Sequence, residues 1–335
     1  MSDKFTIGNC LIELHLHLDG SLSIKNAREL AKLEGVTLPD SDAELKNRLT
    51  VSPGCKDLDE YLTKFDLPCS LLQSAPAIEL AMFNLCNELA DNGVIYGEIK
   101  FAPQQHLQKG LTQEDAIQAA IRGMQKSKLK GSIIVACMRS GQDNHAANFE
   151  TVRLAKKYLG KGVCATDLAG AEAAFPNEGY AEEFKLAREL GVPFTMHSGE
   201  ALGAQSVAVA LDYGASRIGH GVRSLEDPAV IKRLVDNKIT LEVCPKSNID
   251  TCIFKDFAEV PLLKFRELGV LVALSSDDDA VSDTNIRLEY ENMARALNLT
   301  NADIKGFMLN GANAVFADEA TKAELRKLIE ERQPA

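Results

Sequence analysis

The chain lacks the features that mark membrane proteins and nucleic-acid-binding proteins. No apolar run approaches the roughly 20 residues that span a bilayer, and the opening residues, MSDKFTIGN, hold no apolar signal core. The 37 Lys and Arg are outnumbered by 48 Asp and Glu, giving a net charge of −11, so no basic excess is available to bind a phosphate backbone. We therefore expect a cytosolic protein that binds neither nucleic acid nor membrane and acts on a small molecule.

The eight cysteines include no C-x-x-C pair. Several of them, such as Cys10, Cys86, Cys137 and Cys164, lie within apolar stretches. This distribution favours buried reduced thiols over a disulfide framework or a zinc site built from thiolates.

The chain also lacks low-complexity tracts, linkers and long charge blocks, so we expect a single domain over residues 1–335. Apolar runs that do not strictly alternate, as in parallel strands covered on both faces, recur with helical patterns between them. The strand candidates are Leu11–Leu16, Val94–Phe101, Ser132–Cys137, Gly162–Leu168, Val192–Met196, Arg217–Gly219, Thr240–Val243 and Val270–Leu274. Eight such units predict an α/β fold, the (β/α)₈ TIM barrel, rather than an open doubly wound sheet.

One segment is additional to the eight strand–helix units: Ser23–Ser74 is predicted to hold extra helices after the first strand. The i, i+3, i+4, i+7 spacing of its apolar residues predicts one stripe. The stripe consists of Leu58, Tyr61, Leu62 and Phe65. Two interpretations stay open, a stripe that packs on the barrel and a lid over the site.

Polar motifs stand where apolar runs stop. They are HLHLDGS (15–21), DLAGAE (167–172), HSGE (197–200), GHG (219–221) and SSDDD (275–279). In a barrel the carboxyl ends of the strands form a ring, which gathers these motifs at one mouth. His15 and His17, two apart in a strand, point to the same side.

Three histidines and one aspartate from these motifs form a nitrogen-and-oxygen set suited to Zn²⁺ with an activated water. His220, between two glycines, would orient or deprotonate that water, and Glu200, in a partly desolvated pocket, would act as a general acid. Three adjacent carboxylates, Asp277–Asp279, would repel one another unless a cation or a proton relieved them. The residue types leave open which electrophile is attacked.

The ordered motifs resemble those of the adenosine deaminase family over nearly the whole chain, from Leu14 to the region of residues 312–316. The motifs that carry the resemblance are HLHLDGS, YGEIKFAP, DLAG, HSGE, RIGHG, EVCPKSN and SSDD. The resemblance implies one zinc ion per chain, with a purine nucleoside as substrate. The implied metal ligands are His15, His17, His197 and Asp277.

The resemblance also implies the roles of the other site residues. Glu200 would protonate a purine ring nitrogen, and His220, with Asp277, would position the hydroxide. Asp278 and the backbone N–H of Gly170 would bind the purine, and His17 would face the substrate as well as the metal. The stripe of Leu58, Tyr61, Leu62 and Phe65 resembles the family's apolar gate.

Asp19 bears on substrate choice. A carboxylate here is implied to accept a hydrogen bond from the ribose, whereas the adenine-specific branch typically has Glu, so Asp19 favours nucleoside over free base. Asp279, Ala171 and Lys246 depart from the usual family pattern, and Asp279 and Lys246 are expected to affect preference if they lie at the rim.

The favoured reading is zinc-dependent hydrolysis of adenosine, and of 2′-deoxyadenosine, to inosine-type products and ammonia. The alternatives are deamination of adenine or of a modified adenine nucleoside, and a silent purine-binding protein. A silent protein would be expected to have lost a metal ligand or Glu200, and this chain keeps both. A metal-dependent phosphoesterase fits the acidic charge and the lack of a basic phosphate clamp poorly.

Overall fold

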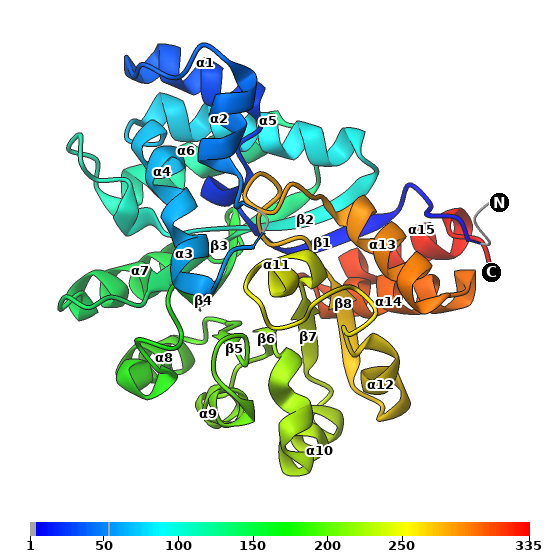
Figure 1. Cartoon of the computed structure of the whole chain (residues 1–335). Helices are drawn as coiled ribbons and strands as arrows, with labels where there is room; N and C mark the ends of the chain where they lie inside the picture. Colours follow the sequence, from blue (N-terminus) through cyan, green and yellow to red (C-terminus); the bar gives the residue numbers. More distant parts are fainter. Residues whose placement is uncertain (1–4, 53) are drawn as a thin grey trace.

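The computed structural model describes residues 5–52 and 54–335. Its strands form two four-stranded parallel sheets, with orders β1-β2-β3-β4 and β5-β6-β7-β8. The strands are β1 (Leu11–His17), β2 (Val94–Phe101), β3 (Gly131–Met138), β4 (Val163–Ala169), β5 (His197–Ser198), β6 (Arg217–His220), β7 (Thr240–Val243) and β8 (Leu271–Leu274). Figure 1 shows them around the centre of the molecule with the helices outside.

The two sheets join into a barrel at two seams. At one seam Thr166 of β4 bridges Phe194, and the Thr195 N–H donates to the Thr166 carbonyl at 3.1 Å. At the other seam the His17 N–H donates to the Asp277 carbonyl at 2.8 Å, and the Asp277 N–H donates to the His15 carbonyl at 2.8 Å. The predicted barrel is therefore confirmed, and its second seam runs through residues expected to bind the metal.

The fifth strand is the one that the sequence placed wrongly. We expected Val192–Met196, but the strand begins at His197 and has two residues. Pro193 has no N–H to give to a ladder, which interrupts regular pairing before His197. The preceding residues still bond to the barrel, because the Phe194 carbonyl accepts from Ser216 at 2.9 Å and the Met196 carbonyl from Gly219 at 2.8 Å.

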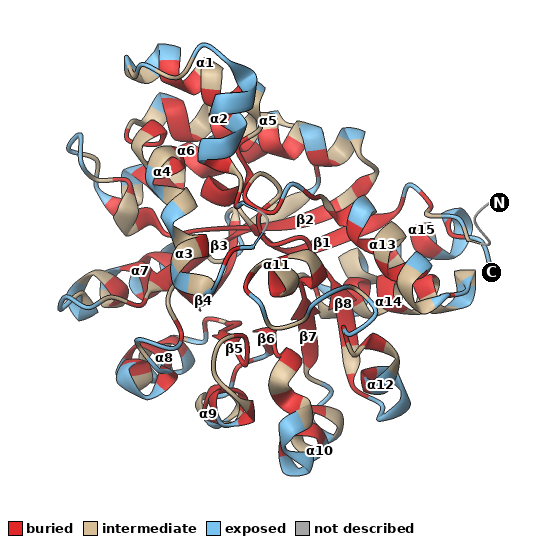
Figure 2. Ribbon diagram, viewed as in Figure 1, coloured by how far each residue is buried: buried red, intermediate tan, exposed pale blue. Residues whose placement is uncertain are grey.

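The helices cover the outside of the barrel, with their buried faces turned toward the strands (Figure 2). They are α1 (Ile24–Glu34), α2 (Asp42–Leu49), α3 (Leu58–Leu62), α4 (Asp66–Leu71), α5 (Ala75–Asp91), α6 (Gln113–Lys126), α7 (His145–Tyr158), α8 (Ala181–Leu190), α9 (Ala204–Tyr213), α10 (Pro228–Asp236), α11 (Pro245–Asp250), α12 (Leu262–Glu267), α13 (Ile286–Leu297), α14 (Asn301–Ala314) and α15 (Glu319–Arg332). Thr112 and Asp115 form a capping box at the start of α6, and Gly191 ends α8 in the left-handed conformation. In the described part of the chain, no helix has both the length and the apolar character to cross a bilayer.

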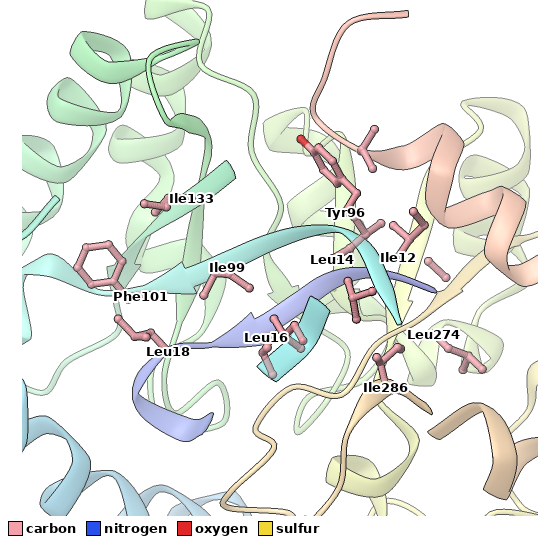
Figure 3. Close-up of a cluster of buried hydrophobic side chains, with 14 of the residues drawn as sticks. Ile12, Leu14, Leu16, Leu18, Tyr96, Ile99, Phe101, Ile133, Leu274 and Ile286 are labelled. Carbon is pink, nitrogen blue, oxygen red and sulfur yellow. The ribbon is translucent and has the colours of Figure 1, made fainter. Parts of the chain in front are cut away.

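Strand β1 alternates more strictly than we expected. Ile12, Leu14 and Leu16 lie in the apolar core between strands and helices, together with residues of β2 and β8 (Figure 3). Glu13 and His15, between them, are fully buried on the inner side, where they meet Ser276 and Glu242. The barrel interior is consequently polar at the level of the site, and the apolar core lies outside the strands.

The extra segment after β1 contains α1 to α4. Part of it forms a small apolar cluster separate from the main core, made of Val51, Cys55, Tyr61 and Val281 with Leu58 and Phe65 against it. Residues 51–52 and 54–65, which we call the lid segment, thus pack partly on Val281, in the loop after β8.

Candidate active site

A cavity of about 740 Å³ opens at the carboxyl ends of the strands. Among its lining residues are His17, Asp19, Leu58, Tyr61, Leu62, Phe65, Gly170, His197, Glu200, His220, Asp277 and Asp278. His15, the remaining expected metal ligand, does not line the cavity; its ring is fully buried beside His17 and His197. The four stripe residues border the cavity, so they are placed where a lid would be.

Three imidazoles and one carboxylate converge beneath this cavity. Nε2 of His197 lies 2.9 Å from Nε2 of His15 and 3.1 Å from Nε2 of His17. Oδ1 of Asp277 lies 3.2 Å from His15 Nε2 and 3.5 Å from His17 Nε2. The four ligand atoms all lie within 4.8 Å of one another. Nitrogen and oxygen donors gathered so closely fit a single metal ion.

The ionisation of three of these four groups suits metal binding. The exception is His15: burial and the charge of Lys100 would lower its pKa, but the hydrogen bond to Asp277 and the charge of that residue raise it to about 9, so a metal ion there would displace a proton. Burial lowers the pKa of His17 and His197, which leaves their imidazoles neutral. Burial alone would raise the pKa of Asp277, but the hydrogen bond and charge of His15 outweigh it and lower that pKa well below its usual range. Neutral imidazole and ionised carboxylate are the forms that bind a metal.

A charged layer lies directly below the four donors. Nδ1 of His15 is 2.8 Å from Glu242 Oε2, and Nδ1 of His197 is 3.0 Å from Asp167 Oδ2. Lys100, itself fully buried, reaches Glu242 at 2.9 Å and Asp167 at 3.0 Å. Carboxylates that hold the far nitrogen of an imidazole fix which nitrogen faces the metal.

No role was predicted for Lys100, Asp167 or Glu242, although each stands in a quoted motif. The alternation of charged and apolar residues along the strands could have indicated that these side chains face the interior. In β2, Glu98 and Lys100 alternate with Ile99 and Phe101, so the charged side chains face the barrel interior.

Two residues of the site have strained backbone conformations. His220 and Asp277 have left-handed φ angles of 59° and 67°, which are costly for residues with a Cβ. At position 219 only glycine fits, because a Cβ there would lie 2.9 Å from Cε1 of His15. The glycine flanking His220 therefore makes room for a neighbouring imidazole.

His220 lies between two acidic side chains. Its Nε2 is 3.6 Å from Glu200 Oε2 and 3.9 Å from Asp277 Oδ2. Its Nδ1 is 3.2 Å from the side-chain amide of Asn248, a residue of the EVCPKSN motif to which the sequence assigned no role. Asn248 therefore fixes the orientation of the ring.

Three carboxyl groups around the cavity are shifted toward their protonated forms. Burial raises the pKa of Glu200 well above its usual range, and the charges of Asp277 and Glu172 raise it further. Burial and then the charge of Asp277 do the same to the pKa of Asp278. Burial also raises the pKa of Asp19 to about 6. Neutral carboxyls can donate as well as accept a hydrogen bond.

Asp278 also connects the site to the lid segment. The Tyr61 hydroxyl donates to Asp278 Oδ2 at 3.0 Å and lies 2.8 Å from the Ser282 hydroxyl. The other oxygens, Oδ1 of Asp278 and Oδ1 of Asp19, are buried and have no hydrogen-bond partner among the described residues. Unpaired buried acceptors at a cavity suggest that a ligand completes their hydrogen bonding.

Two residues that we considered for the rim do not line the cavity. The Asp279 N–H donates to the Ser21 hydroxyl at 3.1 Å, and burial raises the pKa of its side chain to about 8. The Lys246 ammonium pairs with Asp250 on the same helix, α11. Neither therefore lies where it would touch a ligand, whereas Ala171 does border the cavity.

Comparison with known proteins agrees with this geometry. The adenosine deaminase family model matches residues 10–332. The chain belongs to the adenosine deaminase family.

Relatives of this family align over almost the full length. The adenosine deaminase of Haemophilus ducreyi is 45% identical over 97% of this chain and 96% of its own length. That of Clostridium perfringens is 39% identical over 95% of this chain and 97% of its own.

Solved structures related to this family show the same fold. The adenine deaminase from Arthrobacter aurescens has a TM-score of 0.86 at 26% identity, covering 96% of this chain and 98% of its own. A Burkholderia ambifaria amidohydrolase solved with bound zinc has a TM-score of 0.85 at 24% identity, covering 96% of this chain and 89% of its own.

Proposed function

We propose that this protein hydrolyses adenosine and 2′-deoxyadenosine to the corresponding inosine nucleosides and ammonia, as one barrel domain over residues 1–335. One observation carries the proposal. A set of three imidazoles and one carboxylate lies beside Glu200 and Asp278, two buried carboxyls whose pKa is raised. Metal donors beside groups able to give a proton are what hydrolytic attack on an aromatic amidine requires.

His15, His17, His197 and Asp277 would hold the metal ion, for which we propose zinc. When bound, the ion supplies Lewis acidity that makes a water molecule a nucleophile near neutral pH. The fit rests on donor chemistry, on the 4.8 Å spread of the donor atoms, and on the carboxylates that hold the far nitrogens of His15 and His197.

The catalytic residues divide the proton transfers between them. His220 orients the attacking water and takes up its proton, and Asp277 accepts a hydrogen bond from the same water. Glu200 gives a proton to the ring nitrogen next to the carbon under attack, which makes that carbon more electrophilic. The 3.6 Å between His220 Nε2 and Glu200 Oε2 leaves these groups on the same side of the cavity. The amine takes the remaining proton of the added hydroxyl group and leaves as ammonia, and the proton taken up by His220 returns Glu200 to its acid form, so the two water protons end on the amine and the ring nitrogen.

The remaining groups bind the nucleoside. Asp278 pairs with the imidazole-ring nitrogen of the purine, the Gly170 N–H with a pyrimidine-ring nitrogen, and His17 contacts the base. Asp19, whose Oδ1 has no partner among the described residues, accepts a hydrogen bond from the ribose. Leu58, Tyr61, Leu62 and Phe65 cover the bound nucleoside with apolar surface.

The charge of the cavity favours a nucleoside over a nucleotide. Asp19, Asp66 and Asp278 line the cavity together with Glu200. Arg139, the one lining Lys or Arg within the described residues, already donates to the carbonyls of Leu168 and His197. A phosphate group would thus meet acidic side chains without a free cation.

We also place the protein in the cytosol, in purine metabolism. Its eight cysteines are all free and mostly buried, which suits a reducing compartment.

The test is a substrate panel of adenosine, 2′-deoxyadenosine, adenine and AMP with zinc-loaded protein, alongside Asp19→Ala. We expect adenosine to have the highest kcat/KM, and Asp19→Ala to lower kcat/KM for adenosine by about 30-fold while changing adenine turnover little. Faster turnover of adenine than of adenosine, or equal losses for both in Asp19→Ala, would overturn the substrate assignment.

A further inference from the structure

Glu172 is a buried carboxylate with no role in the chemistry described above. It closes the DLAGAE motif and is fully shielded from solvent. Its Oε1 accepts from the Gly199 N–H at 2.8 Å. Its Oε2 accepts from the N–H groups of Glu200, Ala201 and Leu202 at 3.1, 2.7 and 2.9 Å. Four successive backbone donors therefore point at one side chain.

Such a run of N–H groups forms a concave nest that binds an anion. Here the anion belongs to the chain itself. Among the described residues, the hydrogen bonds recorded for these four N–H groups all go to Glu172. Gly199 adopts a φ of 69°, the left-handed conformation that lets the chain turn around the carboxylate. The turn depends on Glu172 for its shape.

The carboxylate is itself fixed from behind. The Ser206 hydroxyl donates to Oε1 at 2.5 Å, and the Asn177 amide donates to the Ser206 and Ser198 hydroxyls at 3.0 and 2.8 Å. Arg139 donates to Asn177 Oδ1 at 2.6 Å and to the His197 carbonyl at 2.7 Å. One buried network therefore connects the turn with the backbone of a proposed metal-binding histidine.

The opposite side of the turn is also held. The Gly199 carbonyl accepts from the Arg223 N–H at 3.1 Å, and the Ala201 carbonyl accepts from the Arg223 guanidinium at 2.7 Å. Arg223 is only partly buried, whereas Glu172 has no exposed surface. The two sides differ in the number of hydrogen bonds, since Glu172 accepts four from the turn and Arg223 donates two to it.

We propose that Glu172 is the positioning residue for Glu200: it binds the backbone of residues 199–202 as an internal anion and thereby sets where the Glu200 carboxyl meets the substrate. The catalytic part of this inference rests on the proposed function, because it assumes that Glu200 is the proton donor. The structural part does not, because the hydrogen bonds to the turn exist whatever the reaction.

Glu172→Gln tests both parts. The amide keeps the size of the side chain but points N–H donors at backbone N–H donors. The matched control is Glu183→Gln, which alters an equally buried glutamate on α8 that pairs with His145 and does not line the cavity. Glu172→Asp keeps the charge one methylene short, and it provides a second variant if the glutamine protein does not fold.

The first readout is amide hydrogen exchange. We expect residues 199–202 to exchange at least about tenfold faster in Glu172→Gln than in wild type, with Glu183→Gln unchanged. Unchanged exchange in this turn would overturn the positioning role, whether or not the protein deaminates adenosine.

The second readout is a double-mutant cycle with Glu200→Gln. A misplaced proton donor is expected to lower kcat by about 100-fold, with KM changed less than about threefold and zinc content equal to wild type. The aspartate variant should lie between glutamine and wild type. In the Glu200→Gln background the same change should cost less than about threefold, because the residue through which Glu172 acts is already disabled. Equal losses in both backgrounds would refute action through Glu200. If wild type has no deaminase activity, the proposed function fails and the exchange result stands alone.

Discussion

The floor of the cavity and the lid segment above it are held by different forces. The floor is made of strand ends whose polar side chains are buried and paired by charge, as Lys100 is with Glu242 and Asp167. The lid segment rests on a small separate apolar cluster. Among its polar connections to the barrel is the Tyr61 hydroxyl, which donates to Asp278. We therefore expect the floor to keep its geometry and the lid segment to open at a lower cost in free energy.

The largest effect should come from disabling the floor's proton donor without disturbing its structure. We expect Glu200→Gln to lower kcat for adenosine by about a thousandfold, because the amide cannot give a proton to the ring nitrogen. Steady-state kinetics, together with metal analysis to verify equal zinc content, measures this. A loss under tenfold would show that another group is the acid.

The next effect should come from breaking the charged layer. In Glu242→Gln, Lys100 and Arg217 lose part of a buried partner, and His15 loses the carboxylate that orients it. We expect a loss of about 3 kcal/mol in the free energy of unfolding and at least about tenfold weaker zinc binding. Urea unfolding and a chelator competition measure these values.

The control for that variant is Glu267→Gln, which removes an exposed ion pair with Lys264 on α12. It should change the unfolding free energy by under about 0.5 kcal/mol. Equal stability losses in both variants would contradict the importance assigned to the buried layer.

A buried histidine after β2, His106, should give the stability of the protein a pH dependence of its own. Burial lowers the pKa of His106 to about 4, although a hydrogen bond to the Leu72 backbone partly offsets the effect. Below about pH 6.5 this histidine therefore takes up a proton in the unfolded chain but stays neutral in the folded protein. The free energy of unfolding consequently falls as the pH drops from 6.5 toward 4. Replacing His106 with Leu should remove up to about 2 kcal/mol of this loss at pH 5. Unfolding curves at pH 7 and pH 5 for both proteins provide the measurement, and identical pH dependence would contradict the burial argument.

The smallest effect should be in the lid. Phe65 is half-buried and borders the cavity, so Phe65→Ala should raise KM for adenosine about tenfold while costing under about 1 kcal/mol of stability. Phe149→Ala is the control, since Phe149 is also partly buried but stacks with Arg153 away from the cavity. A large loss of stability in Phe65→Ala would show that the lid segment is held as firmly as the floor, which would contradict the difference between the two regions.

Sequence patterns predicted the position of a residue best where that position is set by the strand that carries the residue. The positions of His15, His17 and Asp277 followed from apolar runs that stop at polar motifs, because strand ends meet at one mouth of a barrel. The predicted bounds of the fifth strand were wrong because Pro193 interrupts pairing in a run that is otherwise typical of a strand. Sequence patterns could not predict the positions of residues that depend on partners far along the chain. Glu242 below His15, Glu172 under the turn of Glu200, and Asp279 away from the rim are decided by how separate elements pack.

We propose that the floor binds one metal ion and uses it to deaminate adenosine. The most direct measurement follows the ultraviolet change of adenosine with protein stripped by a chelator and then titrated with zinc. The expected result is conversion to inosine that is absent in the stripped protein and saturates at one zinc per chain. Folded protein that binds one zinc per chain and leaves adenosine unchanged would contradict the claim.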